Sequence, residues 1–279
     1  MTQTRCAMAG SLPISTELRA YPPGWNWAAC LTLSLLCGMA WRVLGRTLCR
    51  WSYLQRLTAA APSARNRAKF PKNASALVHS VQSTLVGLVY FPLYFVCSDN
   101  DRYNCSSLWH SHSILWPCAF AGYLLQDMAE DVRLHRAKLV PLPWDMIAHH
   151  CVFLGVLLLQ LVYEKGCFVY TWLIMGEGST IPLLIRWFAI AVQAPQSLIG
   201  KLNLVFFLSF VLLRVIVYGI GLLYFIRDDH HVFRTGFLLS PYQLTPLLVA
   251  GGYVLNLAWA QQMLTVVFKE RRERFAKQA

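Results

Sequence analysis

The sequence predicts an all-α polytopic membrane protein with about seven transmembrane helices. Of its 279 residues, 56% are hydrophobic and only 14% are charged, whereas an ordinary soluble domain carries about 25% charged residues. The hydrophobic residues come in blocks close to 20 residues long, which is the length that an α-helix needs to cross a bilayer. Lysine and arginine fall between the blocks, as they do in the loops of membrane proteins.

The blocks divide the chain into five parts. Residues 1–24 form an irregular, proline-containing segment that we expect to be lumenal, and residues 25–45 are a first, modestly hydrophobic segment that could span the membrane or serve as an uncleaved signal anchor. Residues 46–72 contain seven basic and no acidic residues, so we expect a cytoplasmic loop against anionic lipid headgroups. Residues 73–268 hold six more hydrophobic blocks, at 77–97, 113–129, 144–163, 167–188, 202–226 and 243–268. Residues 269–279 are expected to form a basic cytoplasmic tail.

Two features of the blocks predict local structure. The block 144–163 follows Pro143, and proline is well tolerated where a helix begins. The block 167–188 contains Gly176, Gly178 and Pro182, which predict a kinked or discontinuous helix, tolerated in a membrane where it faces protein or a cavity.

The basic residues also predict the orientation. With alternating sides, 16 lysines and arginines fall on the side of the tail and six on the other, so the positive-inside rule places the tail in the cytoplasm. The sequon at Asn104 then lies on the lumenal side and is a glycosylation candidate. Cys97 and Cys105 flank the same loop and could pair there.

Other classes are disfavoured. The net charge of +12 does not indicate nucleic-acid binding, because the basic residues are neither gathered on one helix nor interleaved with stacking aromatics. The nine cysteines show no C-x-x-C spacing, so neither a zinc site nor a disulfide framework is predicted. Adjacent histidines point about 100° apart on a helix, so no metal site is expected there without ligands from other helices.

Two adjacent histidines, His149 and His150, lie within the first turns of the fourth block. Ionisable side chains at that depth are costly and by default indicate a functional site. Asp145 is four residues before His149 and so shares its helix face. Asp127 and Asp131 end the preceding block, and a short connection normally packs such helices side by side. An imidazole oriented by a carboxylate can act as a general base or nucleophile toward an acyl group; the alternative is a hydrogen-bonding node between helices.

The fifth and sixth blocks add a second polar group. Glu177, Ser179, Thr180 and Arg186 lie in one hydrophobic stretch, and a carboxylate inside the bilayer must be neutral, paired or hydrated. Arg214, in the middle of the sixth block, could pair with Glu177 or extend toward the membrane surface. The simpler interpretation is again a hydrogen-bonding node between helices.

In combination and order, these residues resemble those of the TLC-domain proteins, a family named for translocation-associated, Lag-type and related eukaryotic membrane proteins that includes the ceramide synthases. The resemblance covers roughly residues 69–269. The matching positions are His79, Gly122 with Tyr123, Asp127, His149 with His150, Glu177, Ser179 with Thr180, Pro182, Arg186 with Trp187, Asn203 and Arg214.

The resemblance implies a multi-pass protein of the endoplasmic reticulum, another endomembrane or the plasma membrane, with six helices forming a TLC-type barrel around a cavity. It also implies roles for residues, since the paired histidines of ceramide synthases are essential to N-acylation of a sphingoid base by acyl-coenzyme A. The candidate catalytic residues are therefore His149, His150 and Asp127, and the supporting residues are His79, Asp131, Asp145, Glu177, Ser179, Arg186 and Arg214.

We therefore expect a protein of lipid metabolism or membrane lipid homeostasis with a buried His-His site near the cytoplasmic side. The His-Asp and Ser-Asp motif of the synthases has no counterpart here, which makes the chain more similar to the smaller TLC domain-containing branch. The first alternative is a ceramide-synthase-like N-acyltransferase that uses acyl-coenzyme A and a sphingoid base or other lipid amine, and the second is a lipid transporter or receptor. Membrane lipids are the expected partners, with no cofactor, metal or nucleic acid.

Overall fold

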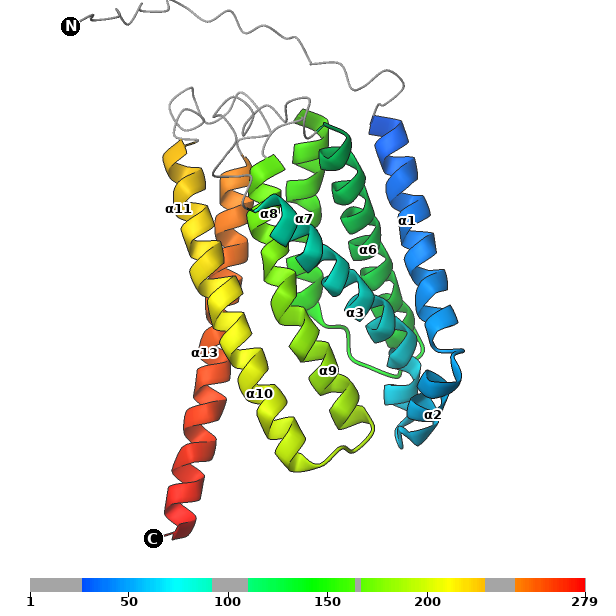
Figure 1. The fold of residues 1–279 in the computed structure, drawn as a ribbon, viewed down its shortest axis with the longest axis vertical. Coiled ribbons are helices and arrows are strands. Elements are labelled where there is room, and N and C mark those ends of the chain that lie inside the picture. Colours follow the sequence, from blue (N-terminus) through cyan, green and yellow to red (C-terminus); the bar gives the residue numbers. More distant parts are fainter. Residues whose placement is uncertain (1–26, 92–109, 164–166, 229–243, 279) are drawn as a thin grey trace, which may run out of the picture.

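The structure is a computed structural model that describes residues 27–91, 110–163, 167–228 and 244–278, and every regular element in these ranges is a helix. The helices run side by side as an elongated bundle (Figure 1). The predicted all-α membrane fold is thereby confirmed. The residues 1–26, Cys97, Asn104 and Cys105, on which some of the sequence predictions rest, lie outside the described ranges.

Helix α1 (Trp27–Leu48) packs closely along α6 (His110–Arg136). At the closest point a Cβ atom added to Gly122 would overlap the carbonyl oxygen of Ser34 and lie 2.8 Å from the backbone nitrogen of Gly38. Small residues permit such backbone contact between helices in membranes. Trp41 of α1 is buried and donates its Nε1–H to the carbonyl oxygen of Ala119 at 3.3 Å. The first hydrophobic segment is thus an integral helix of the bundle.

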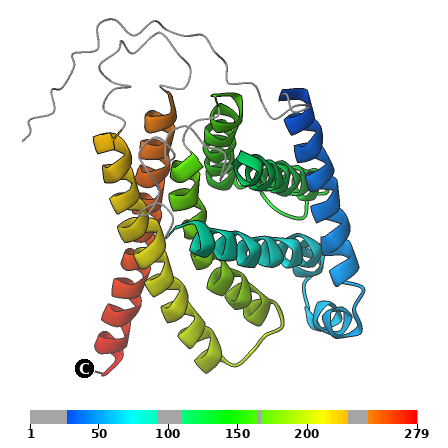
Figure 2. The ribbon, with the colours of Figure 1, turned by 45° about the horizontal axis from the view of Figure 1, so that its top comes forward.

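The basic segment that follows is helical over most of its length, which corrects the expectation of a loop over residues 46–72. It contains α2 (Ser52–Ala60) and the beginning of α3 (Ala64–Tyr90). The Ser63 side chain accepts a hydrogen bond from the backbone N–H of Asn66 and so caps the N-terminus of α3. Figure 2 shows α3 crossing the middle of the molecule, where it contacts α1, α6 and the elements after residue 167.

Helices α6 and α7 (Trp144–Tyr163) lie next to each other, as the short connection predicts. α6 extends to residue 136, beyond the predicted end at residue 129. It ends in a reversal in which Lys138 adopts φ 57° and the N–H of Leu139 donates to the carbonyl oxygen of Leu134 at 3.1 Å. This reversal returns the chain so that α7 begins at the end of the bundle where α6 finishes.

The predicted break in the fifth block is confirmed. α8 (Cys167–Met175) passes into a 3₁₀ turn, η1 (Gly176–Ser179), and then into α9 (Thr180–Ala191). A Cβ atom at Gly178 would lie 2.7 Å from Cδ1 of Leu213, so a larger residue in this turn would require the Leu213 side chain to move.

The sixth block is also interrupted, although nothing in its composition predicts it. α10 (Gln196–Phe210) continues through a π-helical segment, η2 (Val211–Val217), into α11 (Tyr218–Asp228). π-helical turns are rare and often occur at functional sites. The last helix, α13 (Leu244–Gln278), packs against α7, η2 and α11.

The main hydrophobic core lies between α3, α6, α7, α8 and α13, and is formed by aromatic and aliphatic side chains such as Phe120, Phe153, Leu157, Tyr170 and Val249. Many large hydrophobic side chains point outward instead, among them Leu85, Leu204 and Leu223. An outer surface of that kind suits a bundle whose solvent is lipid.

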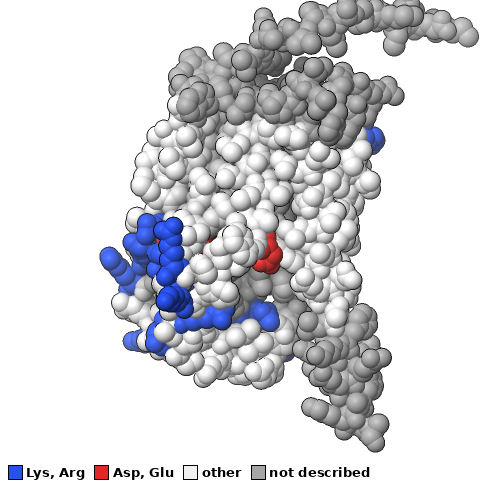
Figure 3. Space-filling model, turned by 180° about the vertical axis from the view of Figure 1, so that it is seen from behind, with Lys and Arg blue, Asp and Glu red and all other residues white. Residues whose placement is uncertain are grey.

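Four segments of the described chain are long and hydrophobic enough to cross a membrane: Ala28–Leu48, Trp144–Leu161, Tyr170–Ala191 and Gln196–Arg227. Helices α3, α6 and α13 are long but more polar, so the total of about seven spans remains a prediction. Figure 3 shows that lysine and arginine gather over the lower part of the back face and leave the band above nearly uncharged. We call this the basic end of the bundle; it is where α1 finishes and α7 begins.

Candidate functional site

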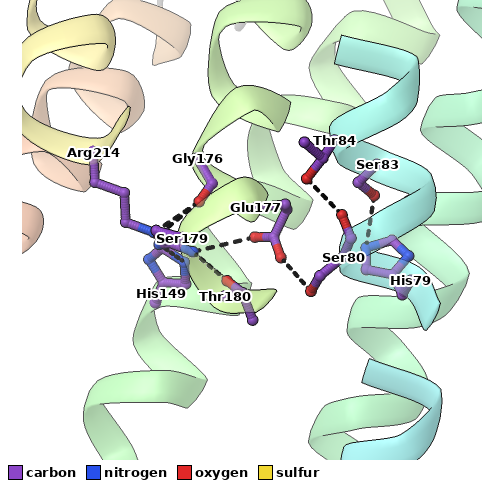
Figure 4. A network of polar contacts seen from close by, with 10 residues as sticks. All are labelled: His79, Ser80, Ser83, Thr84, His149, Gly176, Glu177, Ser179, Thr180 and Arg214. Carbon is purple, nitrogen blue, oxygen red and sulfur yellow. Dashed lines mark hydrogen bonds and ion pairs between the residues drawn. The ribbon is translucent and has the colours of Figure 1, made fainter. Parts of the chain in front are cut away.

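A buried arginine, Arg214, connects four helical segments inside the bundle (Figure 4). Its Nε donates to the hydroxyl oxygen of Ser179 at 2.9 Å and to the carbonyl oxygen of Gly176 at 3.2 Å. Its Nη2 donates to Thr180 Oγ1 at 3.0 Å and to Glu177 Oε1 at 3.3 Å. Of the two alternatives for Arg214, pairing with Glu177 is the one that the structure shows.

The irregular turns bring these groups together. Arg214 lies in the middle of η2, and its partners come from η1 and the first residue of α9. Gly176 is close to the arginine, since a Cβ atom there would lie 3.6 Å from Cγ of Arg214. The other oxygen of Glu177, Oε2, accepts a hydrogen bond from Ser80 of α3 at 3.2 Å. The carboxylate and guanidinium thus neutralise each other inside the membrane, as buried ions must.

The same arginine fixes the ring of His149. Nη1 of Arg214 lies 3.4 Å from Nε2 of His149. A guanidinium only donates, so Nε2 must accept and the neutral ring carries its proton on Nδ1. That Nδ1 is buried and has no hydrogen-bond partner among the described residues. His149 therefore presents an N–H donor, not a basic nitrogen, to anything that reaches it.

His150 lies in a second polar group. Its Nδ1 is 3.6 Å from Oδ2 of Asp127, and the same carboxylate oxygen is 3.0 Å from Nζ of Lys72. Lys72 Nζ also lies 2.5 Å from Oδ1 of Asp131. A carboxylate beside Nδ1 favours the tautomer with the proton there, which leaves the lone pair of His150 on Nε2. The two histidines thus carry opposite roles: a donor at His149 and a potential base at His150.

The charges around Lys72 do not balance. Burial lowers the pKa of Lys72, but the carboxylates of Asp127 and Asp131 outweigh burial and the pKa is raised overall. Burial raises the pKa of Asp131, and the negative charge of Asp127 adds to that rise while Lys72 opposes it. Lys72 therefore stays protonated, and the fold disfavours the anionic form of Asp131.

This imbalance predicts unequal effects of two substitutions. Lys72→Met leaves Asp127 and Asp131 beside each other with Lys69 of α3 as the nearby cation, and we expect a loss of about 2 kcal/mol of stability. Asp131→Asn removes a disfavoured charge and should cost much less. Thermal unfolding in detergent measures both.

The pH dependence gives a second check on Lys72→Met. A carboxyl group whose pKa is raised on folding contributes stability at low pH that is lost as the pH rises through the folded pKa. The deficit of Lys72→Met should therefore shrink on acidification from pH 7 to pH 5. A deficit that grows on acidification would contradict the described pairing.

His79 lies on the far side of Tyr123 from this group. It is 1% exposed, its ring stacks on Tyr123 with centroids 3.7 Å apart, and its Nε2 is 3.2 Å from Ser83 Oγ. Trp41 of α1 meets the His79 ring edge-on at 5.3 Å. His79 thus forms part of an aromatic wall beside the site, near enough to His150 for the two rings to interact electrostatically.

Two predicted site residues lie elsewhere. Asp145, expected beside His149, is exposed on the first turn of α7, because His149 turns toward η2 and pairs with Arg214 instead. Arg186 lies nearer the basic end and donates through Nε to Asn203 Oδ1 of α10. Asp145 therefore leaves the candidate site, and Arg186 joins two helices outside it.

Two polar members were missed by reasoning from the sequence: Lys72 and Ser80. Lys72 was counted among the loop cations, and Ser80 had no distinguishing neighbour in sequence. A signal was nevertheless present for Ser80. With Ser75, His79 and Ser83 it forms a run of small or polar residues that are buried together on α3, and such a face within a membrane helix must contact polar partners.

The site is closely packed. His149 and His150 are only 4% and 5% exposed. The ring of His149 contacts the rings of Phe153 and Trp259, with centroids 4.5 and 5.1 Å apart. The resemblance implied a cavity at the centre of the barrel, whereas in the structure both histidines are buried and Phe153 and Trp259 pack on His149. Ligand entry requires these side chains to move.

Comparison with known proteins gives one match. The family model of the TLC domain matches residues 69–265, a range that begins in α3 and ends in α13 and leaves α1 and α2 outside. The resemblance seen in the sequence covered roughly residues 69–269, and the hydrophobic blocks placed the domain at residues 73–268. No curated protein and no solved structure matches the chain.

Proposed function

Because the chain belongs to the TLC-domain family, it is a membrane protein of lipid metabolism or homeostasis, and we propose that it acts there by recognising a membrane lipid at the His149–His150 site. One observation carries this proposal: Nδ1 of His149 is buried and has no hydrogen-bond partner among the described residues, whereas Nδ1 of His150 lies beside Oδ2 of Asp127 at 3.6 Å. An unmet buried donor costs about 1–3 kcal/mol, which a lipid carbonyl or phosphate oxygen would offset.

The surroundings support a polar but neutral part of a lipid. Arg214 is already neutralised by Glu177 at 3.3 Å, so the His149 end of the site offers N–H donors without an excess cation. Phe153 and Trp259 beside His149 provide apolar contact for an adjoining chain. An ester or amide carbonyl next to a hydrocarbon chain combines both requirements.

Lipid profiling tests this function. Cells lacking the gene would be complemented with the wild-type chain, with His149→Gln/His150→Asn, and with Asp145→Asn as the control on the same helix. Glutamine at position 149 can still accept a hydrogen bond from Arg214, and asparagine at position 150 can still donate one to Asp127. Both replacements therefore retain the polar contacts of the histidine they replace. We expect the wild-type and Asp145→Asn chains to restore the same lipid composition. Full restoration by the histidine variant at equal protein level would refute the proposal.

Acyl transfer is the second candidate, favoured by the Asp127–His150 geometry. With its Nδ1 beside a carboxylate at 3.6 Å, His150 would take a proton through Nε2 from the amine as its nitrogen bonds to the acyl carbon. It would pass that proton to the coenzyme A thiolate, which leaves as the carbon–sulfur bond breaks. The Nδ1–H of His149 would donate to the acyl oxygen as negative charge develops on it. The ring centroids are 5.8 Å apart, close enough for both to reach one acyl carbon and its nucleophile.

Purified protein with long-chain acyl-coenzyme A and a sphingoid base distinguishes the two candidates. Acyl transfer predicts amide formation that falls at least about 100-fold in His150→Asn, and a comparable loss in His149→Gln, with unchanged melting temperatures. If amide forms at the same rate in both variants, these histidines are not the catalysts. If no amide forms in the wild type while lipid profiles still depend on the histidines, recognition without acyl transfer is the function.

A further inference from the structure

A second charged group lies away from the histidines, between α1 and α6. Glu130 of α6 is buried, accepts a hydrogen bond from Arg133 and forms an ion pair with Arg42. Nε of Arg42 lies 3.4 Å from its Oε1, and Nε of Arg133 lies 2.6 Å from its Oε2. The group is built from α1, which lies outside the matched TLC domain, and from α6, which lies inside it.

Each arginine uses only its Nε toward Glu130. The terminal Nη1 and Nη2 groups of Arg42 and Arg133 take part in none of the contacts that bind this cluster, and the two side chains are 46% and 47% exposed. Two guanidinium groups held from behind by one carboxylate therefore present their free N–H groups outward. Such paired forks fit the oxygens of a phosphate group, which accept bidentate hydrogen bonds from arginine.

The charge of the group favours an anion. Two arginines and one glutamate leave one net positive charge. Arg46, one turn beyond Arg42 on α1, and Arg136, one turn beyond Arg133 on α6, are both exposed and extend the positive charge toward the basic end. Figure 3 shows this concentration of lysine and arginine at the lower left of the back face.

The position matches the level of phospholipid headgroups. Arg42 lies six residues before the end of α1 at Leu48, which is about 9 Å along the helix. An arginine so placed extends its stem along the apolar surface and brings its guanidinium to the edge of the hydrocarbon layer. The outward neighbours on α1, Met39 and Val43, are 57% and 62% exposed and provide an apolar surface for acyl chains just inside that edge.

We propose that Arg42 and Arg133, held by Glu130, form a binding site for the phosphate group of an anionic phospholipid in the leaflet at the basic end. The site is independent of the histidines and of the proposed function. Glu130 acts as the positioning residue: it fixes both guanidinium groups at one spacing, so that they need not be ordered when the lipid binds.

Lipid-dependent stability of the full chain tests the proposal. Purified protein in mixed micelles would be titrated with phosphatidic acid, phosphatidylcholine or inorganic phosphate while the melting temperature is followed. We expect stabilisation by phosphatidic acid and much less by phosphatidylcholine, whose choline cancels the phosphate charge. Arg42→Gln and Arg133→Gln should each weaken the apparent affinity for phosphatidic acid about fivefold. Lys201→Gln, which removes an exposed charge on α10, is the matched control and should leave the affinity unchanged.

Glu130→Gln separates a built site from general attraction. The substitution removes a negative charge and so raises the net charge of the group by one. Attraction by net charge alone would therefore strengthen the binding of phosphatidic acid. Binding in a site that Glu130 organises would instead weaken. Arg42→Lys retains the positive charge but loses the planar guanidinium group, and we expect it to bind phosphatidic acid more weakly. This variant can replace Arg42→Gln in the test if Arg42→Gln does not fold. Stronger binding by Glu130→Gln, equal losses in Lys201→Gln, or equal stabilisation by inorganic phosphate would each overturn the proposal.

Discussion

Gly122→Ala is expected to lower the stability of the protein by about 3 kcal/mol or to prevent folding. The added methyl group would overlap the carbonyl oxygen of Ser34 and lie 2.8 Å from the nitrogen of Gly38 and 2.9 Å from Cβ of Cys37. Two of these contacts are backbone atoms, so no rotamer change relieves them and α1 must separate from α6. Overpacking of this kind typically costs 1–3 kcal/mol or more. Thermal unfolding in detergent measures the effect.

A matched glycine serves as the control. Gly200 also lies within a helix, α10, but a Cβ atom there meets nothing within 4 Å. Because alanine favours the helix over glycine by about 1 kcal/mol, Gly200→Ala should be neutral or stabilising. Similar melting temperatures for the Gly122 and Gly200 variants would show that α1 and α6 are not in backbone contact.

Arg214→Met should have the other large effect, a loss of about 4 kcal/mol. The substitution removes every hydrogen bond that joins η2 to η1, α9 and His149. It also leaves Glu177 as an unpaired carboxylate inside the membrane, and breaking a buried ion pair on one side is strongly destabilising. Methionine has a similar length, so the packing of the stem is largely retained and the loss reports the charge.

A double-mutant cycle with Glu177→Gln resolves the pair. Removing both charges should restore part of the stability lost in Arg214→Met, with a coupling of about 1–3 kcal/mol. Arg214→Lys should be intermediate, because lysine supplies the charge but not the planar fork that reaches Ser179 and Thr180 together. Additive losses in the cycle would mean that Arg214 and Glu177 do not depend on each other.

The packing of α1 against α6 connects the stability of the bundle to the candidate site. α1 lies outside the matched range 69–265, yet its Trp41 closes the aromatic wall at His79 and its Arg42 binds Glu130. A change at Gly122 that separates α1 from α6 should therefore disturb the surroundings of the candidate site as well as stability.

Much of the helical scaffold could be predicted from the sequence. Block length and charge placement predicted the membrane class, and Gly176 with Pro182 predicted the break that the structure has at η1. The pairing of α6 with α7 followed from a short connection. It brought Asp127 or Asp131 within reach of His149 or His150, and in the structure Asp127 and His150 are the pair, 3.6 Å apart. These features depend on local composition and on neighbours in the chain, so one sequence suffices to find them.

The partners within the site were beyond such reasoning. Helical spacing made Asp145 the expected partner of His149. The partner is decided, however, by the orientation of α7 about its own axis, because this orientation determines whether His149 faces another helix. In the structure it meets Arg214, from a residue 65 positions away. Lys72 likewise became a site residue only because α3 continues the helix back through the basic segment and carries the lysine to Asp127 and Asp131.

By itself, the sequence determined that this protein is a helical membrane bundle, that its fifth hydrophobic block is broken near Gly176, and that two histidines and several acids lie at membrane depth. Only the tertiary structure decided which charge neutralises which, that His149 donates while His150 can accept, and that a π-helical turn aims Arg214 at both η1 and α7. The physical reason is that membrane depth and helix propensity are properties of a segment. Charge pairing and tautomer depend on atoms a few ångströms away that come from distant parts of the chain.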